Sequence, residues 1–237
     1  MHNNTNMARV LRRMIGKVNV FDMSGFIKGD RVANIRDYID AYVKQGQIKF
    51  AIVNIQELSF VDNNSVTEIF SALRNVGKTV LFYNNEDIKN VIEQYNKQSF
   101  SCYCNKESDV VKILGEELVN IKTPIPYTEK RSALRLKSAI STDVIYRHKN
   151  TNDIITTSGI ITNISEKGAF VEYLDIHSAS RLNKIDYFKN IEICLRPSDN
   201  YFISQDMIGD IVRIEISGNQ TSVAVKFYDD VSLASLS

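Results

Sequence analysis

The chain has 237 residues, of which 43% are hydrophobic and 24% charged, and its 29 lysines and arginines nearly balance 28 aspartates and glutamates. This length predicts two domains, and the near-neutral charge argues against a global field that would draw the protein onto nucleic acid or an anionic membrane. No apolar run is long enough to cross a bilayer, and the polar N-terminus lacks a signal-peptide core, so we expect a cytoplasmic protein.

The first half of the chain alternates between strand-like and helix-like segments. Residues 1–16 are polar and then basic, and we expect a mobile arm there. Apolar residues that alternate or run together predict strands at 17–27, 50–55, 79–83 and 100–104. Apolar residues at helical spacing predict helices at 30–44, 66–73, 88–95 and 108–118. This alternation is typical of an α/β domain with a central sheet, to which we assign residues 1–120.

The segment Phe60-Val-Asp-Asn-Asn-Ser-Val66 lies between a buried strand and a helix, and it resembles the STAS domain, the fold of anti-sigma-factor antagonists. The resemblance covers roughly residues 10–120 and implies a domain that binds a protein partner. In the partner-switching members, the aspartate is followed within two residues by a serine or threonine that accepts phosphate. Asp62 matches the aspartate, but Asn63 and Asn64 cannot accept phosphate, and Ser65 stands where the family usually has glycine. The same residues also suit a simple helix cap.

The three cysteines, Cys102, Cys104 and Cys194, do not predict a disulfide framework, because their number is odd and no secretory signal precedes them. A metal site would need further ligands at suitable spacing, and the sequence shows none. No serine, histidine and acid form a recognisable catalytic set. We therefore expect neither a metal nor an enzymatic activity.

Two of the three prolines, Pro124 and Pro126, fall within residues 121–130, which we interpret as a stiff linker. From residue 131 to 237 the pattern changes to short alternating segments and polar turns. It predicts strands near 136–146, 158–164, 168–173, 191–195, 208–216 and 222–227, a hairpin turn at 150–153, and a helix or loop at 178–189. Several short strands with polar turns are typical of a small all-β barrel.

Two polar motifs lie in this all-β half. Arg131 and Arg135 stand four residues apart, and each guanidinium can grip phosphate oxygens through two parallel hydrogen bonds. Asn163, Ser165 and Gly168 follow in a turn between two apolar strands, where they can meet a base edge. Each motif also has a plainer interpretation, because arginines are mostly solvated and Asn and Ser side chains commonly close turns.

The spacing R-x-x-x-R followed by N-x-S-x-x-G resembles the signature of PilZ domains, six-stranded antiparallel barrels that bind the bacterial second messenger cyclic di-GMP. The resemblance covers about residues 127–230. It implies that the two arginines bind phosphate or stack on guanine, that Asn163 and Ser165 bind a guanine edge, and that Gly168 permits close approach. Lys130 and Arg213 are weaker candidates for phosphate contacts.

Together the two resemblances imply a cyclic di-GMP-binding effector or adaptor, in which the PilZ-like half senses the dinucleotide and the STAS-like half relays to a protein partner. The alternative is a STAS-type adaptor whose PilZ-like half binds no ligand. A third hypothesis is nucleic-acid binding through the basic residues Lys130, Arg131, Arg135, Lys137, Arg147 and Lys149, against which the near-neutral charge argues.

Overall fold

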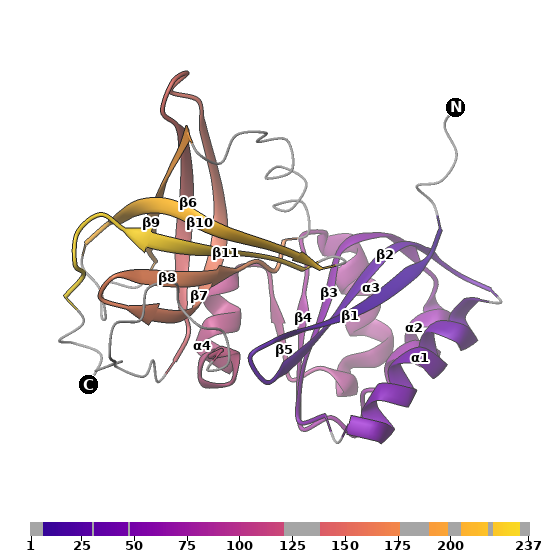
Figure 1. The fold of residues 1–237 in the computed structure, drawn as a ribbon. Helices are drawn as coiled ribbons and strands as arrows, with labels where there is room; N and C mark the ends of the chain where they lie inside the picture. Colours follow the sequence, from indigo (N-terminus) through magenta and orange to yellow (C-terminus); the bar gives the residue numbers. More distant parts are fainter. Residues whose placement is uncertain are drawn as a thin grey trace. The chain divides into compact units, whose positions relative to one another are not determined.

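The computed structural model describes residues 7–29, 31–46, 48–120, 138–175, 190–198, 205–217 and 220–232, which form two compact units (Figure 1). The first unit comprises Val18–Lys106 together with the described residues up to Met14. The second comprises Ile15–Lys17 and the described residues from Glu107 onward.

The first unit is built on a five-stranded sheet with the strand order β1-β2-β3-β4-β5. The strands are β1 (Arg9–Ile15), β2 (Val18–Ile27), β3 (Phe50–Val61), β4 (Lys78–Phe82) and β5 (Cys102–Cys104). The helices are α1 (Arg31–Gly46), α2 (Asn63–Ser71) and α3 (Glu86–Asn96), and a short 3-10 helix, η1 (Lys97–Ser99), follows α3. The pairs β2–β3, β3–β4 and β4–β5 are parallel, so the predicted α/β class is confirmed.

One hydrophobic core joins this sheet to its three helices. Phe21 of β2 and Val53 of β3 are fully buried against it, as are Ile39 of α1 and Ile69 of α2. Burial of one such side chain stabilises the fold by about 1.5–3 kcal/mol. The apolar stripes that predicted α1 and α2 are therefore the faces that pack on the sheet.

The prediction of a mobile arm over residues 1–16 is wrong for residues 9–15, which form strand β1 beside β2. Arg13 is buried there, and its guanidinium donates to the Asp22 carboxylate at 2.7 and 3.1 Å. Asn54 Nδ2 donates to the same carboxylate at 2.9 Å. A buried charge is tolerated when it is paired and hydrogen-bonded. Arg13 is thus a sheet residue, although its charge suggested an exposed basic segment.

The second unit contains a closed barrel of six strands in the order β10-β11-β8-β7-β6-β9. The strands are β6 (Ile140–His148), β7 (Ile154–Ser165), β8 (Gly168–Glu172), β9 (Ile191–Pro197), β10 (Met207–Ser217) and β11 (Gln220–Phe227). All six neighbouring pairs are antiparallel, which confirms the predicted barrel. The predicted hairpin turn joins β6 to β7, with Asn152 at a φ of 59°, a conformation that Asn tolerates.

Alternate residues of the barrel strands fill its interior with apolar side chains. Tyr146 and Tyr173 lie among them, and their hydroxyl groups hydrogen-bond to each other. Burial raises the pKa of both phenols above its usual value. Gly159 faces the same interior, where a Cβ atom would lie 2.8 Å from Val171 Cγ1 and 3.2 Å from Tyr173 Cε1. The missing side chain therefore leaves room for these neighbours.

Helix α4 (Glu107–Leu118) packs on the outside of the barrel against β6 and β7, and its contacts group it with the second unit. Glu107 at its start accepts a hydrogen bond from the Leu174 N–H at 3.0 Å. Among the helices that the structure describes, α4 included, none is long and apolar enough to span a membrane.

Candidate functional sites

The structure describes four of the seven residues proposed for a cyclic di-GMP site, namely Asn163, Ser165, Gly168 and Arg213. Arg131, Arg135 and Lys130 lie outside the described residues, as does the proposed linker at 121–130. The phosphate-binding role of the two arginines therefore stays a prediction. The other four lie on β7, β8 and β10.

Asn163, Ser165 and Gly168 lie on the hairpin formed by β7 and β8, with Ser165 paired to Gly168 across the turn. Ser165 Oγ donates to the Gly168 carbonyl at 3.3 Å and accepts from the Lys167 N–H at 3.3 Å. Both contacts are long for hydrogen bonds. The hydroxyl closes the turn, as its plainer interpretation predicts, and it keeps a second lone pair that could accept from a guanine N–H.

A β-bulge in β7 decides which way these side chains face. The pairing of β7 with β8 shifts between Ile161 and Asn163, and Ile161 and Ile164 both enter the barrel core. Strict alternation from Ile161 would turn Asn163 and Ser165 inward. The extra residue reverses the alternation, so both polar side chains lie on the outer face of the barrel.

A second bulge, in β10 between Ile211 and Arg213, turns Arg213 to the same outer face. Arg213 pairs with Ala224, Ala224 with Phe170, and Phe170 with Asn163. Asn163 and Arg213 are thus the two ends of one row across β7, β8, β11 and β10. Three strand spacings of about 4.8 Å put them roughly 14 Å apart.

The ends and the middle of this row differ in exposure. Arg213 is exposed and Asn163 is half-buried, whereas Phe170 and Ala224 between them are 2% and 0% exposed. Arg213 Nε pairs with Glu215 Oε1 at 3.0 Å. An exposed pair of this kind contributes about 0–1 kcal/mol, so a ligand phosphate could compete for the guanidinium. In this structure a ligand can reach the two ends of the row but not its middle.

The candidate phospho-switch in the first unit is a helix cap. Asp62 caps α2 by accepting the Ser65 N–H at 3.0 Å and the Ser65 hydroxyl at 2.7 Å. The Ser65 hydroxyl, and next its N–H, lower the pKa of Asp62. Ser65 is 2% exposed, and its hydroxyl is engaged by the carboxylate. This arrangement favours the cap interpretation of the motif and makes Ser65 a poor kinase substrate.

An exposed aromatic pair, which sequence analysis missed, lies close to this cap along the chain. Phe26 of β2 and Phe60 of β3 are paired residues whose rings stack with centroids 6.3 Å apart. They are 36% and 42% exposed. Phe60 precedes Asp62 by two residues, so the pair stands where β3 leads into α2. We regard it as a candidate partner-binding surface, because exposed aromatic residues are enriched at interfaces.

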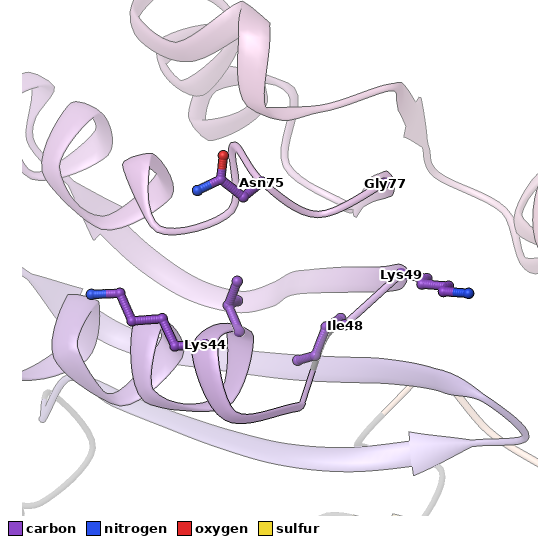
Figure 2. A pocket seen from close by; sticks show the side chains of 6 residues that line it. Lys44, Ile48, Lys49, Asn75 and Gly77 are labelled. Carbon is purple, nitrogen blue, oxygen red and sulfur yellow. The ribbon is translucent and has the colours of Figure 1, made fainter.

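A shallow hollow of about 460 Å³ lies in the first unit between the end of α1 and the turn before β4 (Figure 2). Its lining residues are Val43, Lys44, Ile48, Lys49, Asn75 and Gly77. Lys44 and Lys49 point away from each other, and Lys44 pairs with Asp40 at 2.5 Å. Two diverging lysines do not focus charge on an anion, so we assign no ligand to this hollow.

Two of the basic residues considered for nucleic-acid binding are described, and both have acidic partners. Arg147 pairs with Glu192 at 3.3 Å, and Lys149 pairs with Asp210 at 3.0 Å. The Tyr228 hydroxyl donates to the same Asp210 carboxylate at 2.7 Å. Charge on this face of the barrel is therefore balanced locally, which disfavours attraction to a phosphate backbone.

Solved structures of anti-sigma-factor antagonists are similar to the N-terminal half of the chain. SpoIIAA in its unphosphorylated form is 21% identical, with a TM-score of 0.38 over 44% of this chain and 96% of that chain. The phosphorylated Bacillus cell fate determinant SpoIIAA is 21% identical, with a TM-score of 0.36 over 44% of this chain and 99% of that chain. An antagonist from Mycobacterium paratuberculosis is 13% identical, with a TM-score of 0.39 over 45% of this chain and 94% of that chain.

No protein-family model matches the chain, and no curated protein matches it. The likenesses to solved structures are distant. The topology of both units follows from their own strand pairing. That topology defines a two-unit protein, with an α/β sheet unit followed by a six-stranded antiparallel barrel.

Proposed function

We propose that this protein is a cyclic di-GMP receptor whose barrel senses the dinucleotide and whose STAS-like unit relays the signal to a protein partner. One observation carries the proposal. On an antiparallel six-stranded barrel, a bulge turns Asn163 and Ser165 of the N-x-S-x-x-G motif to the outer face. That is the orientation which a ligand lying on the barrel surface requires.

The chemistry of the seven proposed residues suits a dinucleotide with two phosphates and two guanines. Arg131 and Arg135 supply charge for the phosphates, while Asn163 and Ser165 supply an amide and a hydroxyl for a guanine edge. A hydrogen bond to a charged group contributes about 1.5–3 kcal/mol. A micromolar ligand needs only about 8 kcal/mol in total. Two arginines and one polar turn can therefore account for most of a signalling-range affinity.

We also propose a receptor and not an enzyme, with cyclic di-GMP as its ligand and no metal requirement. The proposed site consists of guanidinium, ammonium, amide and hydroxyl groups and a glycine. These groups are suited to binding and orienting a ligand through charge and hydrogen bonds.

Substitution of the arginines tests the site assignment. Arg131→Ala and Arg135→Ala should each weaken cyclic di-GMP binding at least tenfold, a loss of about 1.4 kcal/mol, in a calorimetric titration. Arg147→Ala is the matched control, because Arg147 is an exposed barrel arginine that is paired to Glu192. It should leave the affinity unchanged. Unchanged affinity in both Arg131→Ala and Arg135→Ala would show that the ligand binds elsewhere.

The second candidate function is a protein-interaction adaptor whose barrel binds no ligand. It is favoured by the burial of Phe170 and Ala224 in the middle of the candidate row. It is also favoured by the exposed Phe26–Phe60 pair, which could dock a partner without any second messenger. In that case wild-type protein gives no heat with cyclic di-GMP, while Phe26→Ala and Phe60→Ala weaken a partner complex that forms without ligand.

A further inference from the structure

Thr162 occupies the bulge of β7 that turns Asn163 outward, and it is 0% exposed. A bulge leaves one residue outside the ladder, so its polar groups need other partners. The Thr162 hydroxyl donates to Glu172 Oε2 at 2.7 Å. Its carbonyl accepts the Asn120 N–H at 2.9 Å. Side chain and backbone of the bulge are therefore both held, by two different elements.

The first contact fixes the bulge to β8. Glu172 lies on the outer face of the barrel, paired with Ile160, and it is 0% exposed. At 2.7 Å, this hydrogen bond has the usual length of an O–H···O bond in proteins. This bond holds Thr162 in the outward position. Because the bulge sets the direction of the next residues, it also sets the orientation of Asn163 and Ser165.

The second contact joins the bulge to α4, since Asn120 follows two residues after the helix ends at Leu118. The end of α4 also contacts the turn between β1 and β2. The Lys17 N–H donates to the Glu117 carbonyl at 2.8 Å. Gly16, at a φ of 57°, lets the turn approach so closely that a Cβ atom would lie 2.5 Å from the same oxygen.

We infer that Thr162 is a positioning residue that orients the candidate ligand-binding hairpin and couples it, through Asn120 and α4, to the turn at Ile15–Lys17. The inference rests on the proposed function, because it assigns a regulatory path to the same site. Ile15 ends β1 and Val18 begins β2, so a shift of this turn passes along the chain into the sheet of the first unit. Ligand at Asn163 and Ser165 then shifts this turn, at which β1 and β2 are joined.

The positioning role is tested by two substitutions, one isosteric with threonine and one that keeps the hydroxyl but lacks the γ-methyl group. Thr162→Val removes the hydroxyl, and Thr162→Ser keeps it. Thr162→Val should weaken cyclic di-GMP binding at least tenfold in a calorimetric titration, whereas Thr162→Ser should stay within about threefold of wild type. Thermal unfolding shows that each variant is folded. If both folded variants bind as wild type does, or if serine fails to restore binding, the positioning role is wrong.

The coupling is tested by a pair of variants at Asn120. Asn120→Pro removes the backbone N–H that donates to the Thr162 carbonyl. Asn120→Ala keeps this N–H and also removes the asparagine side chain. The readout is hydrogen exchange of the Lys17 amide. Cyclic di-GMP should slow this exchange in wild type and in Asn120→Ala, but should leave it unchanged in Asn120→Pro, although all three proteins bind the ligand.

A ligand-free arm separates this inference from the proposed function. Without ligand, Asn120→Pro should exchange the Lys17 amide faster than Asn120→Ala, because the segment after α4 has lost its hydrogen bond to the bulge of β7. If wild type gives no heat with cyclic di-GMP, the proposed ligand is wrong, and the ligand-free comparison still decides the coupling. Equal hydrogen-exchange rates of the Lys17 amide in the two Asn120 variants would overturn the coupling.

Discussion

Asn163 of β7 and Arg213 of β10 stand at the two ends of one row of residues across the barrel, and each lies beside a β-bulge. They are fifty positions apart in the sequence, and three strand spacings of about 4.8 Å separate them in the barrel. Bulges re-aim side chains and are over-represented next to binding sites. The two bulges together present an amide and a guanidinium on one outer surface.

Arg213→Ala should weaken cyclic di-GMP binding roughly two- to tenfold, less than the loss of Arg131 or Arg135 does. The effect is smaller because a ligand phosphate must first displace Glu215 from the guanidinium, a pair worth about 0–1 kcal/mol. Glu215→Gln is the matched control, and it should maintain or strengthen binding because it frees Arg213 from that pair. Titration of both variants checks this. A loss in Glu215→Gln equal to that in Arg213→Ala would mean that the pair, and not the guanidinium, matters.

Asp62→Ala should destabilise the first unit by about 1 kcal/mol, with a range of about 0.5–2 kcal/mol, because α2 loses its N-cap. Asp62→Asn should retain most of the stability, since Asn caps about as well as Asp. Urea unfolding of the first unit, followed separately from the barrel, measures both. Equal losses in the two variants would indicate that the charge of Asp62, and not its capping oxygen, stabilises the helix.

The same cap gives a pH dependence. Hydrogen bonds from Ser65 lower the folded-state pKa of Asp62 below its unfolded value of about 3.9. The stabilisation is therefore present above the unfolded pKa and is lost as the pH falls through the folded-state pKa. Unfolding measured between about pH 6 and pH 2 should show this loss in wild type and not in Asp62→Asn. An identical acid profile in both proteins contradicts the assignment.

We predict that no kinase switches the first unit at the position where the STAS family carries its serine or threonine, because Asn63 and Asn64 stand there. Ser65 is buried and donates to Asp62, so phosphate on it would require α2 to open. Mass spectrometry of protein purified from its native host should find these residues unmodified. Stoichiometric phosphate on Ser65 would show that the shifted serine has taken over the role.

Gly159→Ala should destabilise the barrel by about 1–3 kcal/mol, because the added methyl group would meet Val171 and Val144 at 2.8 and 2.9 Å. Ser158→Ala, one residue earlier on the same strand and exposed, is the control and should stay within about 0.5 kcal/mol of wild type. Calorimetric unfolding measures both variants. A barrel transition in Gly159→Ala as high as in the control would show that the interior has spare room.

Local patterns predicted most of the elements, because apolar periodicity and turn residues are local properties. The strand at 50–55 was underestimated, since β3 continues to Val61 through polar residues such as Gln56 and Glu57. Strand β1 was missed because Arg13 is buried by pairing with Asp22, a partner that depends on the sheet. Charge alone suggested an exposed arm. Such errors arise where tertiary contacts override the average behaviour of a residue type.

The candidate site was predictable in composition but not in geometry. The spacing of Asn163, Ser165 and Gly168 placed them at one turn, and the structure does so. Alternation alone would have turned Asn163 inward beside Ile161, and only the bulge corrects this. The shared row with Arg213 depends on pairing between strands distant in sequence. Local patterns carry no information about such a pairing.

Calorimetric titration of the wild-type protein with cyclic di-GMP decides whether the barrel is a receptor for this dinucleotide. We predict saturable heat with a dissociation constant in the micromolar range or tighter, equivalent to about 8 kcal/mol or more. A linear dinucleotide of the same two guanosines is the control and should bind more weakly, because it lacks the closed pair of phosphates. No saturable heat up to about 1 mM ligand, in protein whose barrel is shown to be folded, would contradict the claim.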